Sequence, residues 1–590
     1  MNKLECLKQV YGYSSVRDGQ EAVVDALMAG RDAMCVMPTG AGKSVCYQLP
    51  AMLLDGVTLV VSPLISLMKD QVMALKAVGV PAAFINSSLT PGQCREAMRR
   101  AAAGAYRIVY IAPERLDSPD FLDFTRQVAI PLVAVDEAHC ISQWGQDFRP
   151  SYLRIAAFLD ALPRRPAVGA FTATATRAVR DDVVGLLGLR DPLRLTTGFD
   201  RPNLYFEVRR PKDKLGALLR VIDDHPDAPG IVYCSTRKNV EEVCALLRES
   251  GYAATRYHAG LADDERRDNQ DDFRYDRARV MVATNAFGMG IDKSDVRFVV
   301  HYNMPKNIES YYQEAGRAGR DGAEAVCTLL YGGQDVVLAR WMIEHGQENE
   351  ELTREERDTL RKRDLARLRD MTLYATSSGC LRRKLLQYFG ERTEAECGRC
   401  SGCNDTAEDV AADAVDGLRL RKRTKKPKPV AADVDAALLQ RLKALRNQMA
   451  KERGIPAFVI FTDATLIDMA QKRPETWGEM LGVSGVGNAK LRDYGGAFLA
   501  ALRGEEAPSQ AAPASLPPKE KRGARAGKPT ATSAPSPKLT WEGSAWSASE
   551  DERLLGEYDE GMKAAQIAGL HRRSVAEVRA RLRHLNLEDD

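Results

Sequence analysis

The feature that most constrains the fold is a double series of short β-branched runs that alternate with helical patterns. The first series extends from residue 4 to about residue 198, and the second begins after residue 203. Parallel strands need a crossover connection, usually a helix, so this alternation predicts parallel sheets. We therefore expect an α/β protein with two consecutive parallel-sheet domains. The expected strands are residues 33–37, 58–62, 83–85, 108–111, 132–136 and 168–172 in the first domain, and 230–234, 253–257, 280–284, 298–302 and 325–331 in the second.

The charge balance excludes a polycation of the histone kind. The 590 residues include 84 Lys and Arg against 81 Asp and Glu, a formal net charge of +3. A nucleic-acid-binding role therefore requires that the cationic residues be concentrated locally. Hydrophobic residues make up 44% of the chain and charged residues 28%, which is typical of folded globular protein and excludes disorder of the whole chain.

A glycine-rich loop follows the first expected strand. Residues 33–44 read AMCVMPTGAGKS and pass from an apolar run into a helical pattern. Glycines let backbone N–H groups turn toward a phosphate, a lysine reaches the β and γ phosphates, and a hydroxyl ligates Mg²⁺. The general pattern would place Gly where Met37 stands, so the match is to the PTGxGKS variant, and a simple turn before a helix is the alternative. The predicted nucleotide-binding residues here are Thr39, Gly40, Gly42, Lys43 and Ser44.

A later strand ends in two carboxylates, as a magnesium site opposite a phosphate loop requires. Residues 132–139 read LVAVDEAH. We predict that Asp136 and Ser44 hold Mg²⁺, and that Glu137 orients or deprotonates the attacking water. A buried strand that merely ends in acids is the alternative, and the phosphate loop makes it the weaker one.

Longer strings around these motifs resemble the RecQ family of superfamily-two DNA helicases. In the first domain they are YGYSSVRDGQ at residues 11–20, SPLISLMKDQV at 62–72, YIAPERL at 110–116, DEAHCISQWGQDFRPSY at 136–152 and FTATAT at 171–176. In the second domain they are YHAGL from residue 257, VATNAFGMGIDKSDVRFVVHYNMP from residue 282 and ESYYQEAGRAGRDG at 309–322. The resemblance covers residues 4–405 and implies two RecA-like motor domains.

The resemblance also implies ATP hydrolysis coupled to 3′–5′ movement on DNA in recombination and repair. Gln20, with Tyr13 and Arg17, resembles the adenine-reading motif of the family. A guanidinium supplied from outside the phosphate-loop domain stabilises the transition-state charge on the γ-phosphoryl oxygens. Arg317 and Arg320 in the second domain are placed for this role, so their contact with ATP would close the cleft between the two domains.

An aromatic-rich loop follows the carboxylates. Trp144 and Phe148 lie close to Arg149 in the sequence QWGQDFRP. Ring faces stack on any base and arginine pairs with phosphate, so an exposed loop of this kind suits single-stranded DNA. The alternative is that both rings belong to the core. The corresponding loop of the resembled family favours the DNA-binding interpretation for all three residues.

Four of the twelve cysteines fall together. Cys397, Cys400 and Cys403 have CxxCxxC spacing, and sixteen residues separate them from Cys380. Four thiolates suit tetrahedral Zn²⁺, and the spacing alone also allows an iron–sulfur cluster. The intervening string LRRKLLQYFGE resembles the RecQ zinc-binding subdomain, which favours zinc. The other cysteines are scattered singly, as expected of free thiols in a reducing compartment.

The composition of the remaining chain predicts smaller units joined by linkers. Residues 419–429 hold seven Lys or Arg and no acid, and the stretch after residue 504 is rich in Pro, Ala, Ser and Lys. The expected division is a RecA-like ATP-binding domain at 1–200, a RecA-like C-terminal domain at 201–333, a helical zinc-binding subdomain at 334–405, a basic linker at 406–432, a helical bundle at 433–505, a disordered linker at 506–540 and a C-terminal helical unit at 541–590.

Both C-terminal units carry resemblances of their own. Residues 433–505 resemble the helicase-and-RNase-D C-terminal (HRDC) domain, and their turn with Gly485, Gly487 and Lys490 predicts either a phosphate contact or a tight helix–helix turn. The last unit weakly resembles a helix-turn-helix. The region of its expected third helix is basic, which would allow it to lie on DNA as a recognition helix does; the arginines concerned are Arg572, Arg573, Arg579, Arg581 and Arg583. A protein-docking role or a solvated basic face is the alternative.

The chain departs from the fuller RecQ architecture in one respect. A winged-helix domain of about a hundred residues is expected after the zinc site, and only about thirty residues separate that site from the HRDC-like unit. We therefore expect no winged helix, and an ATP-gated DNA-binding or strand-annealing protein remains an alternative to a helicase, with an RNA helicase as another.

We expect single-stranded and tailed or forked DNA as partners, with single-strand-binding protein and other repair proteins as further candidates. Residues 1–13 contain no apolar segment of a secretory signal, and no run of about 18 apolar residues occurs. We therefore expect no membrane partner and a cytoplasmic, nucleoid-associated protein of a bacterial cell, with ATP, Mg²⁺ and Zn²⁺ as cofactors.

Overall fold

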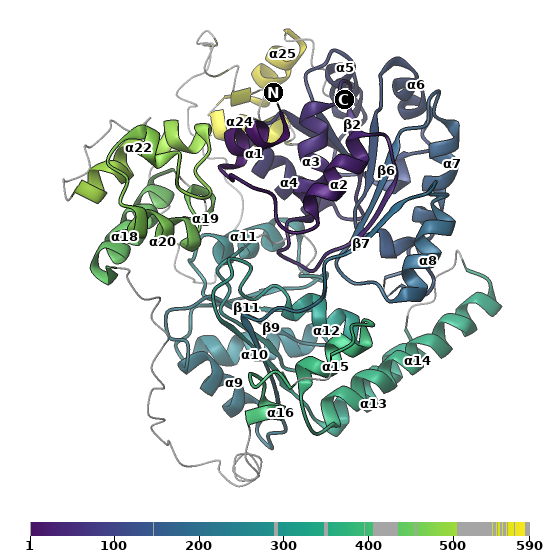
Figure 1. The fold of residues 1–590 in the computed structure, drawn as a ribbon, viewed down its shortest axis with the longest axis vertical. Helices are drawn as coiled ribbons and strands as arrows, with labels where there is room; N and C mark the ends of the chain where they lie inside the picture. The colour runs from purple at the N-terminus through teal and green to yellow at the C-terminus, as the bar shows by residue number, and fades with distance from the viewer. Residues whose placement is uncertain are drawn as a thin grey trace, which may run out of the picture.

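The computed structural model describes residues 2–145, 147–287, 293–346, 352–393, 396–404, 435–453, 455 and 457–503, together with residues 546, 550, 553–554, 557–558, 562, 564–571 and 573–584 of the C-terminal unit. Both predicted linkers, at 406–432 and 506–540, lie outside these residues. The expectation of two parallel-sheet domains followed by helical units is confirmed (Figure 1).

The first α/β domain is built on a seven-stranded sheet with strand order β3-β4-β2-β5-β6-β1-β7. Every strand pair in it is parallel. The strands are β1 (Ala33–Val36), β2 (Thr58–Val61), β3 (Ala82–Ile85), β4 (Ile108–Ile111), β5 (Leu132–Val135), β6 (Ala167–Thr172) and β7 (Leu193–Thr196). The helices are α1 (Lys3–Tyr11), α2 (Gln20–Met28), α3 (Lys43–Leu53), α4 (Ile65–Ala77), α5 (Pro91–Ala102), α6 (Pro119–Gln127), α7 (Arg154–Ala161) and α8 (Arg177–Leu186), with 3₁₀ turns η1 (Pro113–Arg115), η2 (Ala138–Ile141) and η3 (Pro150–Leu153).

The second α/β domain has a six-stranded parallel sheet with strand order β10-β11-β9-β12-β13-β8. Its strands are β8 (Leu204–Arg209), β9 (Gly230–Tyr233), β10 (Ala254–Tyr257), β11 (Val280–Ala283), β12 (Phe298–His301) and β13 (Ala325–Leu330). Its helices are α9 (Lys214–Asp223), α10 (Arg237–Glu249), α11 (Asp263–Arg274) and α12 (Ile308–Ala315). The sequence did not predict β7 and β8.

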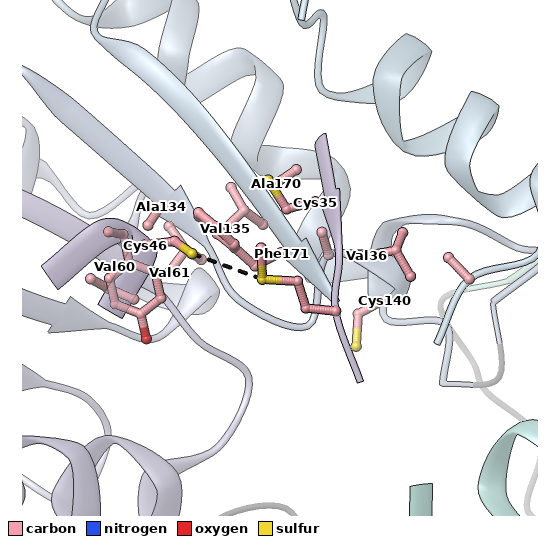
Figure 2. Close-up of a cluster of buried hydrophobic side chains, with 14 of the residues drawn as sticks. Cys35, Val36, Cys46, Val60, Val61, Ala134, Val135, Cys140, Ala170 and Phe171 are labelled. Carbon is pink, nitrogen blue, oxygen red and sulfur yellow. Dashed lines mark hydrogen bonds between the residues drawn. The ribbon is translucent and has the colours of Figure 1, made fainter. Parts of the chain in front are cut away.

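The core of the first domain lies directly beneath the glycine-rich loop. Figure 2 shows Cys46 of α3 among side chains of β2, β5 and β6, including Val60, Val135 and Phe171. The Cys46 thiol lies 3.8 Å from the Met37 sulfur, where the chain leaves β1. Strands buried on both faces read as continuous apolar runs, which is why their sequences predicted them well.

Helical units follow the two sheets. The zinc-binding region comprises α13 (Gly333–Glu344), α14 (Arg354–Thr376), α15 (Leu381–Tyr388) and α16 (Ser401–Asn404). The helical bundle comprises α18 (Ala436–Arg453), α19 (Ala457–Ile460), α20 (Asp463–Lys472), α21 (Trp477–Met480) and α22 (Asn488–Arg503), and α24 (Ala564–His571) and α25 (Val575–His584) belong to the C-terminal unit. Among the described helices, none is both long enough and apolar enough to cross a lipid bilayer.

The two C-terminal units pack against the first α/β domain. The Gly485 N–H of the bundle donates to the Gly12 carbonyl at the end of α1, at 3.2 Å. In the C-terminal unit, the carbonyls of Tyr558 and Met562 accept hydrogen bonds from the Gln93 amide of α5 at 3.0 and 3.3 Å. In Figure 1 the bundle and the yellow C-terminal helices accordingly lie beside the purple N-terminal elements.

Candidate ATP-binding cleft and DNA-facing loop

The glycine-rich loop turns sharply between β1 and α3. Gly40 and Gly42 both have a φ of 82°, in the left-handed region that favours glycine. Lys43 is the first residue of α3, and its Nζ donates to the Met37 carbonyl at 3.3 Å. Ser44 follows in the same first turn. The loop therefore presents its backbone and the Lys43 ammonium at the N-terminal end of a helix, where the helix dipole favours an anion.

The predicted adenine-reading residues contact this loop from the start of α2. The Gln20 amide, which is buried, donates to the carbonyls of Ala41 and Gly42 at 3.0 and 3.1 Å. Arg17 donates from its guanidinium to the Gly40 carbonyl at 2.5 Å. Tyr13 is 38% exposed. Two of the three predicted residues, Gln20 and Arg17, thus lie at the loop. The contact with Gln20 is close, because a Cβ atom at position 42 would lie only 2.6 Å from Gln20 Nε2.

The two carboxylates lie at the carboxyl end of β5. Asp136 accepts a 3.0 Å hydrogen bond from the Glu137 N–H, and both side chains are buried. Glu137 has a φ of 47°, a left-handed conformation that non-glycine residues rarely adopt. His139 Nδ1 lies 3.3 Å from a Glu137 carboxylate oxygen and 2.8 Å from the Thr172 hydroxyl. The DEAH segment is therefore tied to the end of β6, where the FTATAT string begins.

The charges of the cleft are strongly coupled. Burial lowers the pKa of Lys43 despite the opposing influence of Glu137 and Asp136. Burial, reinforced by the charge of Glu137, raises the pKa of Asp136. Burial alone would raise the pKa of Glu137, but the His139 hydrogen bond and the Lys43 charge outweigh it and lower that pKa. The geometry thus keeps Glu137 ionised, as a group that orients water must be.

The two predicted arginines lie across the cleft in the second domain. Arg317 is buried and close enough to Glu137 for its charge to lower the pKa of that carboxyl. A Cβ atom on Gly40 would lie 3.6 Å from the backbone of Arg320. The two domains also share a direct hydrogen bond, because the Thr39 hydroxyl donates to the Gly316 carbonyl at 2.9 Å. The structure thus brings both arginines to the nucleotide loop and its carboxylates.

One arginine that the sequence did not single out bridges the two walls of the cleft. The Arg201 guanidinium donates to the Thr39 carbonyl of the first domain at 2.7 Å. It also donates to the Ala318 and Gly319 carbonyls of the second domain at 3.0 and 2.9 Å. Because Arg201 lies in the connection between the two sheets, its guanidinium fixes the glycine-rich loop relative to the arginine loop.

The aromatic-rich loop is joined to the back of the DEAH segment. Trp144 is 46% exposed, so the interpretation of its ring as core is wrong. A Cβ atom on Gly145 would lie 2.2 Å from the His139 carbonyl oxygen, so only glycine permits this packing. Phe148 is half-buried, and Arg149 bonds the Asp147 carboxylate at 3.0 Å and the Pro63 carbonyl at 2.9 Å. Gln146 lies outside the described residues.

The four predicted cysteines converge on one point. Their four sulfur atoms all lie within 4.8 Å of one another, with separations of 3.5 Å for Cys400 and Cys403 and 3.9 Å for Cys397 and Cys403. Tetrahedral zinc with Zn–S bonds of about 2.3 Å requires sulfur separations of about 3.8 Å, so the residues fit this ion. Burial opposes ionisation of Cys380, but N–H donors from Arg383 and Cys397 lower the pKa of its thiol.

The zinc-binding region reaches the cleft through a second arginine that sequence reasoning missed. Arg382, in the first turn of α15, is buried and donates to the Asp200 carboxylate at 2.6 Å and to the Arg201 carbonyl at 2.7 Å. The four-cysteine site thereby braces the segment that carries Arg201. The string FDRPN was the available signal for this segment, but nothing in its composition indicates two distant partners.

The structure distinguishes between the predictions made for the two C-terminal units. The Gly485 N–H is already donated to Gly12, and burial lowers the pKa of Lys490 to about 8, so this turn is a packed helix–helix turn. The prediction that Arg573 lies on DNA is wrong. Its side chain is 1% exposed, pairs with Glu550 at 3.0 Å and stacks on Trp546 at 4.2 Å, because a unit this small needs the residue for its core.

Four family models match consecutive parts of the chain. They are the DEAD/DEAH box helicase at residues 17–182, the helicase conserved C-terminal domain at 213–322, RecQ zinc-binding at 333–404 and the HRDC domain at 435–502. An ATP-dependent DNA helicase RecQ of Bacillus subtilis (strain 168) is 38% identical over 581 residues, which cover 84% of this chain and 97% of that protein. The chain belongs to the RecQ family.

Two further relatives match the chain over most of its length. An ATP-dependent DNA helicase RecQ of Pasteurella multocida (strain Pm70) is 34% identical over 595 residues, covering 84% of this chain and 93% of that protein. A putative ATP-dependent RNA helicase of Acanthamoeba polyphaga mimivirus is 38% identical over 416 residues, covering 69% of this chain and 73% of that protein. The RecQ zinc-binding match ends at residue 404 and the HRDC match begins at residue 435, so this RecQ chain has only residues 405–434 in between.

Proposed function

We propose that this chain is an ATP-dependent DNA helicase of the RecQ type that moves 3′–5′ on DNA in recombination and repair. The observation that carries the proposal is the cleft, in which Lys43, Asp136 and Glu137 of one parallel-sheet domain face Arg317 and Arg320 of the other. Relatives named ATP-dependent DNA helicase RecQ align with most of the chain, which supports the helicase part of the proposal. The domain division given above from the sequence is part of the proposal.

The residues of the cleft divide the work of ATP hydrolysis. Gln20, Arg17 and Tyr13 bind the adenine, and the backbone from Thr39 to Gly42 cradles the phosphates. Lys43 binds the β and γ phosphates. Glu137 orients or deprotonates the attacking water, and the lowered pKa of its carboxyl keeps it ionised for the orienting role. Arg317 and Arg320 stabilise the negative charge that develops on the γ-phosphoryl oxygens.

Two oxygen ligands in the cleft fit magnesium. The Ser44 hydroxyl lies in the first turn of α3, and Asp136 is buried beside Lys43. Oxygen donors that leave most positions to water and phosphate suit Mg²⁺, which would neutralise charge on the β and γ phosphates. Ser44 and Asp136 would hold this ion, and the charge of the ion would favour the ionised form of Asp136 against the burial that raises its pKa.

Hydrolysis is coupled to movement through the shared contacts of the two domains. Thr39, Gly316 and Arg201 join the glycine-rich loop to the arginine loop. The γ-phosphate of ATP contacts both loops and so favours the closed cleft. Release of the phosphate after hydrolysis removes these contacts. Because the aromatic loop packs on His139 at Gly145, closure of the cleft also alters the DNA-facing side.

The DNA contacts are assigned to Trp144, Phe148 and Arg149. The exposed Trp144 ring offers a stacking face that does not discriminate between bases. Single-stranded, tailed and forked DNA are the proposed substrates, with single-strand-binding protein and other repair proteins as proposed partners. We place the protein in the bacterial cytoplasm at the nucleoid, with no membrane partner.

One observation favours a second candidate function. The interval of residues 405–434 is too short for a domain of about a hundred residues, so a winged helix cannot lie between the zinc-binding and HRDC units. An ATP-gated protein that binds or anneals strands without separating a duplex therefore stands as the alternative. An RNA helicase is a weaker one, named by a single relative among those above.

A strand-displacement assay tests the proposal directly. We expect ATP-dependent displacement from forked and 3′-tailed DNA duplexes, little from 5′-tailed ones, and ATPase stimulation by single-stranded DNA well above that by RNA of the same length. Full DNA-stimulated ATPase without displacement would replace the helicase by the alternative. Stronger stimulation by RNA would overturn the DNA assignment.

A further inference from the structure

Two arginines of α14, in the zinc-binding region, contact the same tryptophan of the aromatic loop. The guanidinium carbon of Arg363 lies 3.6 Å from the centroid of the Trp144 ring, in stacking contact. Arg367 donates a hydrogen bond to the Trp144 carbonyl. Residues four apart lie on one face of a helix, so α14 holds both the ring and the backbone of this residue.

The Trp144 ring is still available for stacking by a further planar group. The Arg363 guanidinium contacts the ring, and 46% of the residue is nevertheless exposed to solvent. Any base can stack on an exposed aromatic face, and a ring that is already held in place loses less conformational entropy when the base binds. The Arg363 contact supplies that restraint, because planar guanidinium groups stack on tryptophan more strongly than on other rings.

Arg363 also carries a hydrogen-bond donor that no described residue accepts. Its Nη1 is buried and has no acceptor among the described residues, which is uncommon for a charged group. Phosphate oxygens are preferred partners of guanidinium N–H groups. A phosphate of a nucleotide stacked on Trp144 would be such a partner, provided that the Arg363 side chain turns the buried Nη1 toward solvent when DNA binds.

The same helix continues toward the cleft. Arg367 lies 4.0 Å from the Glu309 carboxylate, which belongs to α12, the helix that leads into the loop of Arg317 and Arg320. The Tyr388 hydroxyl of α15 donates to that carboxylate at 2.7 Å. The position of the Trp144 backbone is therefore tied to the second domain as well as to the DEAH segment.

We propose that Arg363 completes a nucleotide-binding site with Trp144: it holds the ring for base stacking and donates Nη1 to the phosphate of the stacked nucleotide. The zinc-binding region thereby supplies a DNA ligand as well as a structural brace. This inference rests on the proposed DNA-dependent function, and it extends the DNA site beyond the three residues of the loop.

Replacing Arg363 separates its two roles. For Arg363→Ala we expect the Kd for a short oligothymidylate to rise about three- to tenfold. We also expect the slope of log affinity against log salt to become shallower by about 0.7, the value for one lost phosphate contact on a single strand. Quenching of a 2-aminopurine base placed in the oligonucleotide should fall because the ring is no longer held. Arg363→Lys should keep the salt slope and lose the quenching, since an ammonium keeps the charge without the stacking plane.

The matched control is Arg361→Ala on the same helix. Arg361 is 38% exposed and pairs with Asp358 at 3.4 Å, so its loss should change the Kd, the slope and the quenching less than twofold. In a Trp144→Ala background, Arg363→Ala should shift the salt slope and leave the residual quenching unaltered. Melting temperatures establish that each variant is folded.

Two results would overturn the inference. Arg363→Ala that behaves like Arg361→Ala in all three measurements would show that Arg363 does not touch DNA. Tighter binding by Arg363→Ala would show that the guanidinium competes with the base for the ring. The ATPase activity of the unmodified protein is measured with and without single-stranded DNA as a separate test. If DNA does not stimulate it, the proposed function itself is refuted; if DNA does stimulate it, the Arg363 variants test the role of Arg363 alone.

Discussion

The nucleotide cleft and the aromatic loop are built on the two sides of one short segment, and they solve opposite physical problems. In the cleft, Asp136 and Glu137 are buried, Lys43 is half-buried, and the three interact with one another and with the second domain. In the loop, Trp144 stays nearly half exposed and is restrained from behind by α14. Charge stabilisation requires the exclusion of water, whereas sequence-independent stacking requires an open ring face.

The comparison teaches where a substitution should act. A change in the cleft should alter the hydrolytic step whether or not DNA is bound. A change in the loop should alter the response to DNA by a larger factor than the hydrolytic step. The contact of Gly145 with the His139 carbonyl is the point where the two regions meet, so it limits how far they can be separated.

The largest expected effect is that of Lys43→Ala. Loss of the ammonium should lower kcat for ATP hydrolysis by about 10³-fold or more, because the charge that binds the β and γ phosphates is removed. The Kd for single-stranded DNA should stay within about twofold, since Lys43 lies at the glycine-rich loop and not on the aromatic loop. Steady-state ATPase and fluorescence anisotropy measure the two. Lys238→Ala is the control, with a side chain 82% exposed. DNA-stimulated turnover that survives in Lys43→Ala would refute the cleft assignment.

Removal of the zinc site should affect both regions together. Cys397→Ser leaves three thiolates, and structural zinc contributes apparent binding free energies of about 10–16 kcal/mol in small zinc peptides. We expect loss of bound zinc by elemental analysis, lower solubility, and a joint fall of ATPase activity and DNA affinity, because Arg382 and α14 depend on this region. Iron in place of zinc, or a well-folded protein without metal, would contradict the zinc assignment.

Arg201→Ala should slow hydrolysis by about ten- to a hundredfold, because the glycine-rich loop and the arginine loop lose their shared donor. Arg201→Lys should restore little of kcat, since one ammonium cannot reach all of these carbonyls. Arg194→Ala on β7 is the matched control, with a side chain 56% exposed and paired with Asp181. An unaltered kcat in Arg201→Ala, measured at saturating ATP, would show that the loops hold their positions without it.

Trp144→Ala should raise the DNA concentration for half-maximal ATPase stimulation by about five- to a hundredfold, as expected from the loss of one stacked base. Trp341→Ala provides the control, because Trp341 is 57% exposed on α13 and stacks on His345. The contrary result is that Trp144→Ala loses DNA-free and DNA-stimulated ATPase equally and melts at a lower temperature. That result would show that the Trp144 ring stabilises the fold, and that the loop does not act separately from the cleft.

The smallest expected effect concerns the C-terminal helix α25. Arg583 is exposed on it, and Arg583→Ala should lower DNA affinity by less than about twofold at physiological salt. The salt dependence of oligonucleotide binding checks this. A large loss of affinity would place DNA on the C-terminal unit and extend the DNA-facing region well beyond the aromatic loop.

The elements that the sequence predicted well are those whose residues are buried on both faces. Strands β4 and β5 read as continuous apolar runs, and each was expected within one residue of its observed end. Strand β7 was missed because it lies at the edge of its sheet, where Arg194 and Thr196 alternate with half-buried leucines. An edge strand exposes one side to water and loses the apolar signal on which the expectation depends.

The number of arginines in a helix did not predict which of its arginines are available to bind DNA. The sequence drew attention to Arg573 beside α25, which is buried against Trp546 and Glu550. It gave no weight to α14, whose Arg363 lies on the ring of Trp144. Arginine serves equally as a core ion-pair partner, a stacking plane and a phosphate ligand, so the local sequence cannot distinguish these roles.

By itself the sequence determined the chemistry of the cleft and of the zinc site. The glycine-rich loop, the DEAH carboxylates and the CxxCxxC cysteines are each contiguous, so the ligand types and their spacing are written in neighbouring residues. Only the tertiary structure decided which distant groups meet them: Arg201 at the glycine-rich loop, Arg382 beneath it and Arg363 on the aromatic ring. Contacts between segments more than a hundred residues apart depend on how whole helices and sheets pack, and no local pattern of residues encodes that geometry.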